Sequence, residues 1–381
     1  MALAASSEWT TYDDTLNTNL DISDVLSAIL LVDDNFLAKV NSGKRSLDTV
    51  HYWVEDSLVS NKVTQLSTES ALDASGTSLV LAADQGLRVR IGALLRDEAA
   101  GKSEILQVTA ISTDTLTVVR GYGTSTGETH AAAATFRVIG MPKQEGADTQ
   151  NSLNVAKTRQ SNATQIFERG IYLTGSFVQR PQVAIQDHVK WEVHKKVLEL
   201  RREMSSALID SVIAATAAGN DTTYRSMSGL REFISQATDP NTDSTSQAMS
   251  VSTLEDLLLK CWDKGGAPNT VVGNIRQIKK IADLYKENVR YAPSDRVRGT
   301  LVQKFLSSQG FELDLAPNHW VNQDEVMVLD MSKAFLVPYR DMLVEPIAPT
   351  GDAKKWQVIG EYTLELRNRA EAHGLKTNLT V

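Results

Sequence analysis

The chain has 381 residues and a formal net charge of −8, from 39 Lys and Arg against 47 Asp and Glu. Apolar residues make up 42% and charged residues 23% of it, which fits a globular protein with a packed core and excludes a disordered chain. The acidic balance argues against a dedicated nucleic-acid-binding protein, because such proteins concentrate Lys and Arg to displace the counterions of phosphate.

The first 60 residues carry nearly all of the negative charge. Ten carboxylates stand here against three basic residues, so this segment carries −7 and the other 321 residues carry −1. Asp21 and Ser23 can cap a helix, and five apolar residues follow at helical spacing. These are Val25, Leu26, Ile29, Leu30 and Val32. We expect a short amphipathic segment in an acidic arm, and such a segment needs a partner surface.

Export and membrane signals are not expected. The first basic residue is Lys39, so the basic start of a signal peptide is missing, and the apolar run 25–32 is shorter than the ~20 residues that span a bilayer. We expect the protein to be made and kept in a cytosol. Cys261 is the single cysteine, which excludes an intrachain disulfide and a cysteine-based zinc site, and its apolar surroundings predict a buried thiol.

Residues 66–140 read as an all-β region. Five short apolar runs separated by glycines predict a small barrel or sandwich. The predicted strands are 79–81, 87–91, 105–111, 116–119 and 136–139. A barrel of this size could bind single-stranded nucleic acid, but the region has six basic against eight acidic residues and only Tyr122 and Phe136 for base stacking. Nucleic-acid binding here is therefore disfavoured.

One long helix is predicted over residues 187–218, which contain no Gly or Pro. Its apolar residues form two stripes, so we expect it to pack between two surfaces. The first stripe is Val189, Val193, Val197, Leu200, Met204, Ala207 and Ser211, and the second is Trp191, Leu198 and Ile209.

Cations lie between the two stripes of this helix, interleaved with Glu192, Glu199 and Glu203. They include Lys190, Lys195, Lys196, Arg201 and Arg202. The favoured interpretation is a solvated face with ion pairs one turn apart. The alternative is non-specific contact with a polyanion.

The second half of the chain alternates helices and strands. Helices are predicted at 252–264 and 274–286, and Asn274 is a good N-cap for the second. Strands are predicted at 270–272, 325–329, 334–337, 342–347 and 356–366, the last two around a turn at 349–352. We expect a compact α/β centre between extended ends.

Candidate catalytic motifs are incomplete. The glycine-rich loop 121–127 lacks the strand–loop–helix context of a phosphate loop, and 239–243 lacks the glycine and glutamate of a calcium loop. Residues 271–274 join a strand to a helix N-terminus, where an enzyme could hold an anion, but with one glycine and no adjacent lysine. None of the six histidines has a partner at metal-binding helical spacing. We expect no catalytic residues, no metal and no cofactor.

Five segments and their order resemble the major capsid proteins of tailed bacteriophages with the Hong Kong 97-type fold, in the branch that carries a β insertion domain. The segments are HYWVEDSL at 51–58, RGYGT at 120–124, SNATQIF at 161–167, YRDMLVEP at 339–346 and GEYTLE at 360–365. The similarity extends over most of the chain, and the order of the segments is more specific than any one of them.

The resemblance implies an α+β fold with named parts. They are an N-terminal arm (1–45), an extended loop (46–178) containing the β insertion domain (66–140), the spine helix of a peripheral domain (179–218), an axial α/β domain (219–340) and the C-terminal strands of the peripheral domain (341–381). A neighbouring subunit would then provide the partner surface for the acidic arm.

The resemblance also implies a function. The protein would self-assemble into hexamers and pentamers of an icosahedral head that encloses double-stranded DNA. Its partners would be its own copies, neighbouring capsomers, the portal and a decoration protein, with DNA bound only non-specifically and no membrane involved. It would be assembled in the host cytoplasm and reside in the virion. The alternatives are an α/β small-molecule enzyme, and a decoration or minor virion protein.

Eight residues are expected at contacts between subunits. They are Val25, Ile29, Trp53, Glu55, Asp56, Arg159, Arg340 and Asp341. Many relatives carry a cleaved N-terminal scaffolding segment, but here the arm starts close to Met1, so we expect none. We also expect no Lys–Asn cross-links between subunits, because no motif allows their residues to be transferred.

Overall fold

The computed structural model of the chain describes residues 34–56, 58–148, 157–179, 188–214, 219–237, 239–284, 304–349 and 351–380. The chain divides into two compact units, one made of Met1–Trp53 with Gln160–Val381 and the other of Val54–Arg159. Each has a hydrophobic core of its own. Where described, the chain has no helix that is both long and apolar enough to cross a membrane.

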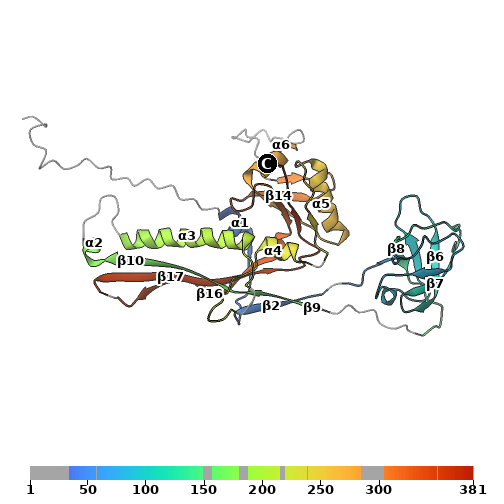
Figure 1. The fold of residues 1–381 in the computed structure, drawn as a ribbon, viewed down its shortest axis with the longest axis horizontal. Coiled ribbons are helices and arrows are strands. Elements are labelled where there is room, and N and C mark those ends of the chain that lie inside the picture. The colour runs from blue at the N-terminus through green and yellow to red at the C-terminus, as the bar shows by residue number, and fades with distance from the viewer. Residues whose placement is uncertain are drawn as a thin grey trace, which may run out of the picture. The chain divides into compact units, whose positions relative to one another are not determined.

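The unit Val54–Arg159 contains a small β-barrel. Six strands pair in the order β3-β8-β5-β6-β7-β4, and a bridge between Gln65 and Leu81 joins the two outer strands. Figure 1 labels β6, β7 and β8 of this unit. The strands are β3 (Lys62–Thr64), β4 (Ser78–Val80), β5 (Leu94–Asp97), β6 (Ile105–Ser112), β7 (Thr115–Val119) and β8 (Thr135–Gly140). The barrel therefore begins before residue 66, where the sequence predicts the start of the β region.

The predicted strand at 87–91 is wrong. The segment begins with a short 3-10 helix, η1 (Gly86–Arg88), and Val89 is buried while Leu87 and Ile91 are exposed. In a strand, these three side chains would share one face. Asp114 explains the difference, because its carboxylate accepts hydrogen bonds from the backbone of Asp84 (3.1 Å) and Gly86 (2.8 Å) and so fixes a turn. Strands β3 and β5 were not predicted.

A four-stranded sheet in the larger unit has the order β1-β16-β17-β10. The strands are β1 (Asn41–Ser42), β16 (Ala334–Ile347), β17 (Ala353–Leu366) and β10 (Gln165–Thr174), and β16 and β17 form a long hairpin (Figure 1). The sequence predicts two strands where β16 is continuous. Irregularities in register near Arg340 interrupt its pairing without ending it. The expected domain boundary between residues 340 and 341 falls inside this strand.

Helix α3 (His188–Asp210) lies along this sheet (Figure 1). Its first predicted stripe packs into the core shared with β10 and β17, and the C-terminal half of the helix is the more deeply buried. The helix ends before residue 218, where the sequence predicts its end. The backbone beyond Asp210 is held by other partners: Gly229 N donates to Ser211 O (2.7 Å), and Ile213 N donates to Glu232 Oε2 (2.7 Å).

A second sheet has the order β11-β18-β15-β12-β14-β13. Its strands are β11 (Thr242–Asp243), β12 (Thr270–Gly273), β13 (Lys304–Leu306), β14 (Glu312–Pro317), β15 (Val326–Leu329) and β18 (Gly374–Lys376). Helices α5 (Val251–Asp263) and α6 (Ile275–Leu284) share a core with one face, which includes Val271 and Val328. The neighbouring Val272 and Met327 face the other way, into the core shared with α3.

The remaining elements are short. They are α1 (Asp34–Lys39), α2 (Gly175–Gln179), α4 (Leu230–Ser235), η3 (Met331–Lys333) and the two-stranded sheet of β2 (Val50–Glu55) and β9 (Thr158–Ala163). Helix α1 contacts α3, and α4 packs between α3 and β18. The predicted helices α5 and α6 are confirmed, and Ser250 caps α5 by accepting from Thr253 N (3.1 Å).

Candidate functional site

A row of polar side chains lies on one face of β17. Glu361, Thr363 and Glu365 alternate with apolar residues, so they point to the same side of the strand, and all three are buried. Buried carboxylates need partners, because an unpaired charge away from water costs several kcal/mol. The partners come from distant parts of the chain, so hydrogen bonds and ion pairs to this row connect those parts to β17.

Glu361 has three partners. Thr164 Oγ1 donates to its carboxylate (2.5 Å), Arg340 Nε lies 3.2 Å from Oε2, and Arg225 NH2 donates to Oε1. Arg225 also donates through Nε to the carbonyl of Thr164 (2.8 Å). The predicted contact residue Arg340 therefore has a partner in its own chain, and about half of its side chain is still exposed.

Glu365 accepts from His51 Nε2 (2.9 Å) and Arg367 Nε (2.6 Å). Burial raises the pKa of Glu365, but these two bonds outweigh it and hold that pKa below its usual value. His51 also stacks on Trp53, which packs against Phe233 and is only 6% exposed. Trp53 is thus a core residue of its own subunit, which leaves little of the predicted contact side chain for a neighbour.

Asn162 adds a clamp beside this row. Its amide donates to the carbonyls of Ser228 (3.1 Å) and Leu364 (2.7 Å), and its Oδ1 accepts from Ser228 N (2.8 Å). Next to it, Thr363 Oγ1 donates to Ala163 O (2.8 Å). These bonds hold the end of β9 on β17.

Thr164 joins the two chain segments that flank residues 54–159. Its N–H (2.9 Å) and its hydroxyl (3.1 Å) both donate to the carbonyl of Thr49. The sequence indicated the segment 161–167 by resemblance but did not predict the roles of Asn162 and Thr164. One signal was present, because the alternation Glu-x-Thr-x-Glu in an otherwise apolar strand predicts a polar row on one face.

The other predicted contact residues are exposed or half-buried, or lie outside the described residues. Asp56 and Arg159 are exposed, Glu55 is half-buried, and Lys157 Nζ lies 3.9 Å from Asp56. Asp341 is exposed in the irregular part of β16. Val25 and Ile29 lie outside the described residues.

The cations of α3 are mostly balanced by acids. Lys195 Nζ lies 3.1 Å from Glu192, and Lys196 Nζ lies 2.9 Å from Glu199, each one turn away. Arg202 is exposed and lines a hollow of about 430 Å³ beside α3, together with Arg169 and Glu203, which pair with each other. Lys190 and Arg201 are exposed. The helix therefore presents mixed charge rather than a continuous basic groove.

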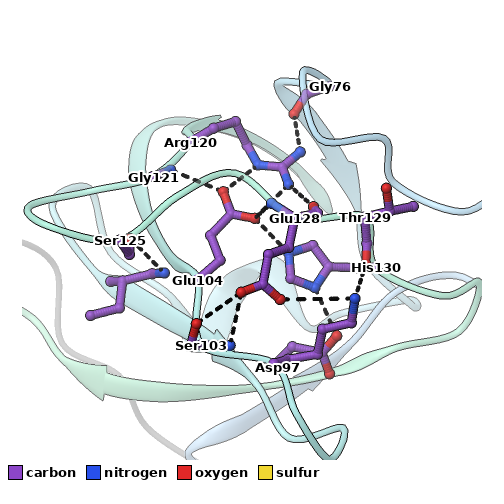
Figure 2. A network of polar contacts seen from close by, with 12 residues as sticks. Gly76, Asp97, Ser103, Glu104, Arg120, Gly121, Ser125, Glu128, Thr129 and His130 are labelled. Carbon is purple, nitrogen blue, oxygen red and sulfur yellow. Dashed lines mark hydrogen bonds and ion pairs between the residues drawn. The ribbon is translucent and has the colours of Figure 1, made fainter.

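The barrel contains a separate buried network (Figure 2). The side chains of Asp97, Glu104 and His130 are almost fully buried, and His130 lies between the two carboxylates, with Nδ1 2.7 Å from Asp97 and Nε2 3.0 Å from Glu104. Each ring nitrogen therefore faces one carboxylate oxygen. Arg120 also binds Glu104, with Nε 2.8 Å and NH2 2.6 Å from the Glu104 oxygens.

Backbone amides also bind Glu104. Gly121 N (2.9 Å) and Glu128 N (2.7 Å) donate to its carboxylate, so the glycine-rich loop 121–127 encloses a side chain of the protein itself (Figure 2). Burial alone would raise the pKa of Glu104. The hydrogen bonds from Arg120, Glu128, Gly121 and His130 outweigh this effect and lower the pKa to about 2. Arg120 in turn donates to Gly76 O (2.9 Å), which ties a third loop to the network.

A catalytic or metal centre does not emerge from these groups. Within the described ranges, no three His, Cys, Asp or Glu side chains are grouped to hold a metal ion. Cys261 is buried as predicted, and burial raises the pKa of its thiol to about 11, which makes it a poor nucleophile. The polar clusters are saturated with protein partners, so their geometry supports a structural role.

Comparisons with known proteins agree with this role. The family model described as SU10 major capsid protein matches residues 9–380. No curated protein matches the chain.

Similar solved structures extend over nearly the whole chain. The capsid of cyanophage A-1(L) is 9% identical, with 98% of this chain and 100% of that chain covered and a TM-score of 0.56. A chain of Microbacterium phage Oxtober96 is 11% identical (97% and 98% covered, TM-score 0.53), and the capsid of a native GTA particle is 10% identical (99% and 100% covered, TM-score 0.52). These similarities show the Hong Kong 97-type capsid fold, with mixed α and β structure. Because the family match includes almost every residue, the chain belongs to the SU10 major capsid protein family: it is a structural protein of the virion, not an enzyme, and its copies assemble into the icosahedral phage head.

Proposed function

We propose that the subunit builds this head as hexamers and pentamers around double-stranded DNA. In this proposal residues 46–178 are the extended loop that reaches a neighbour, with 66–140 as its β insertion domain. Residues 179–218 and 341–381 form the peripheral domain, and 219–340 form the axial domain at the capsomer centre. The observation that carries the proposal is the family match over residues 9–380. The clamp around Asn162 and Thr164 supports the bounds of the loop, because it fastens both chain segments flanking residues 54–159 to one subunit.

Electron microscopy of the protein expressed alone tests the oligomeric state. We expect closed shells, tubes or capsomer rings, with fivefold and sixfold rings within closed shells. A decoration protein would bind only to preformed shells. Particles with a single ring symmetry, or a stable monomer at high concentration, would contradict the proposal of hexamers and pentamers.

We further propose that the acidic arm, residues 1–45, lies across a neighbouring subunit through Val25 and Ile29. Six carboxylates and no basic residue precede Asp34, and the apolar residues 25–32 recur at helical spacing. This segment can therefore present an apolar stripe to a partner surface. The double variant Val25→Asp/Ile29→Asp should keep the subunit folded and reduce shell yield at least tenfold. Unchanged yield would contradict the role of the arm.

For the packaged DNA we propose only weak contacts, through Lys190, Lys195, Lys196, Arg201 and Arg202. The support is that Lys195 and Lys196 are paired with glutamates, which leaves little net charge to bind phosphate. DNA binding should vanish at moderate salt and show no sequence preference in a filter-binding assay. We also propose the portal and a decoration protein as partners, which copurification with heads from infected cells tests.

A further inference from the structure

Helix α5 has an exposed apolar stripe in addition to its buried one. Leu254, Leu257 and Leu258 pack into the core beneath the helix. On the outer side, Leu259 is 42% exposed and Trp262 is 60% exposed. A large aromatic side chain left this open on a structural protein indicates a contact surface, because Trp is enriched at the centres of interfaces.

The turn between β13 and β14 continues this surface. The ring of Phe311 meets Trp262 edge-on at 5.6 Å between centroids. Ser308 donates to the carboxylate of Glu255, which fixes the turn against α5. We name Leu259, Trp262 and Phe311 the α5 patch.

The α5 patch has an acidic border. Its exposed or half-buried carboxylates outnumber its lysines. The carboxylates are Glu255, Asp256 and Asp263, against Lys260.

Helix α6 presents the opposite combination on a different part of the same domain. Its exposed apolar residues are Ile275, at 61%, and Leu284, at 39%. At 100° per residue the two lie on opposite sides of the helix, and the charged residues on the Ile275 side are mainly basic, with Arg276 and Lys279 against Asp283. We name Ile275, Arg276 and Lys279 the α6 patch.

We propose that the α5 patch of one subunit docks on the α6 patch of a second copy of this chain. A rotational ring needs two different, complementary surfaces on every subunit, and these two patches combine exposed apolar side chains with opposite charge. Contact of the α5 patch with itself would instead bring carboxylates together. The inference rests on the proposed hexamers and pentamers, since it assigns the contact that would close their rings.

Site-directed cross-linking tests the contact directly. Subunits carrying Leu259→Cys are mixed with subunits carrying Ile275→Cys and treated with a flexible bismaleimide. Both changes are at exposed positions, and Cys261 is buried, so the background reaction should be low. We expect a covalent dimer in the mixture and none with either variant alone. A dimer from Leu259→Cys alone, or no dimer in any sample that contains capsomers, would overturn the proposal.

Charge reversal gives an independent readout. Asp256→Lys/Asp263→Lys and Arg276→Glu/Lys279→Glu should each raise the protein concentration needed for capsomer formation at least tenfold, and mixing the two variants should restore assembly. Thermal unfolding of each variant controls for folding. Full assembly of each double variant by itself would overturn the α5–α6 contact. Failure of the unmodified protein to form hexamers and pentamers, with the cross-link still present, would overturn the proposed oligomeric state and leave this contact standing.

Discussion

The barrel and the β17 row both bury carboxylates, but they obtain their partners differently. In the barrel, Arg120 and His130 lie 16 and 26 residues from Glu104 along the chain. On β17, Glu365 pairs with His51, which is 314 residues away, and Glu361 with Arg225, which is 136 residues away. The barrel network can therefore form within one module, whereas the β17 row forms only when the ends of the chain have met. Short loop closures cost less entropy than long ones, which favours early formation of the barrel.

Removing the barrel's central carboxylate should have the largest effect. Glu104→Gln keeps the shape but leaves Arg120 and His130 without their shared anion, and breaking a buried pair in this way costs about 3–5 kcal/mol. We expect hydrogen exchange measured by mass spectrometry to show lost protection within 62–140 and little change around β17. Glu98→Gln is the matched control, because Glu98 forms a more exposed pair with Lys62. Equal loss of protection in both units would refute the independence of the barrel.

Acid should act on the same network. The pKa of Glu104 is about 2 in the folded state, below the ordinary value of 4.5 for a glutamate, so its contribution to stability is present above pH 4.5 and is lost as pH falls toward 2. The shift corresponds to about 3 kcal/mol. Urea midpoints of the barrel, measured by hydrogen exchange from pH 5 to pH 2, should fall more steeply in the unmodified protein than in Glu104→Gln. Parallel curves would contradict this assignment.

The clamp on β17 should respond with a smaller loss. Asn162→Ala removes three hydrogen bonds and leaves the buried Ser228 N–H without an acceptor. This should lower the free energy of unfolding by about 2–3 kcal/mol. Hydrogen exchange should become faster at 160–165, around Ser228 and along β17, while exchange in the barrel stays the same. Asn322→Ala, at an exposed asparagine with one side-chain bond to Glu325, should change little. Increased exchange in the barrel would show that the two regions are coupled.

Arg340→Ala should have the smallest effect on the subunit. Arg340 is the more exposed of the two arginines on Glu361, and such pairs contribute about 1 kcal/mol or less, while Arg225 remains in place. Unfolding midpoints should therefore shift little, and Arg225→Ala should lower them more. If shell yield falls while the midpoint stays constant, the exposed part of Arg340 serves a contact between subunits. A large shift in the midpoint would instead make it a residue of internal stability.

Local patterns predicted helices α5 and α6 well. The apolar spacing and the caps at Ser250 and Asn274 determine α5 and α6, because these signals lie within one or two turns. The hairpin of β16 and β17 was also evident from its turn and apolar alternation, although the continuity of β16 was missed. The second predicted stripe of α3 is buried only in part, because Ile209 is buried while Trp191 and Leu198 are half-buried.

Errors arose where a distant group decided the local structure. Asp114 converts the apolar run 87–91 into a turn, and Gly229 and Glu232 take the backbone groups that would have continued α3. None of these partners can be read from the spacing of the residues around it.

The sequence by itself determined the acidic arm, the main helices and strands, and the resemblance to a capsid protein, because charge, periodicity and segment order are local properties of the chain. The tertiary structure alone decided that His130 lies between two carboxylates and that Asn162 joins Ser228 to Leu364, which are 66 and 202 residues from it. Buried polar groups must be paired, but any of many residues could have supplied the partner. The packing of the sheets, rather than the order of residues, selects which one does.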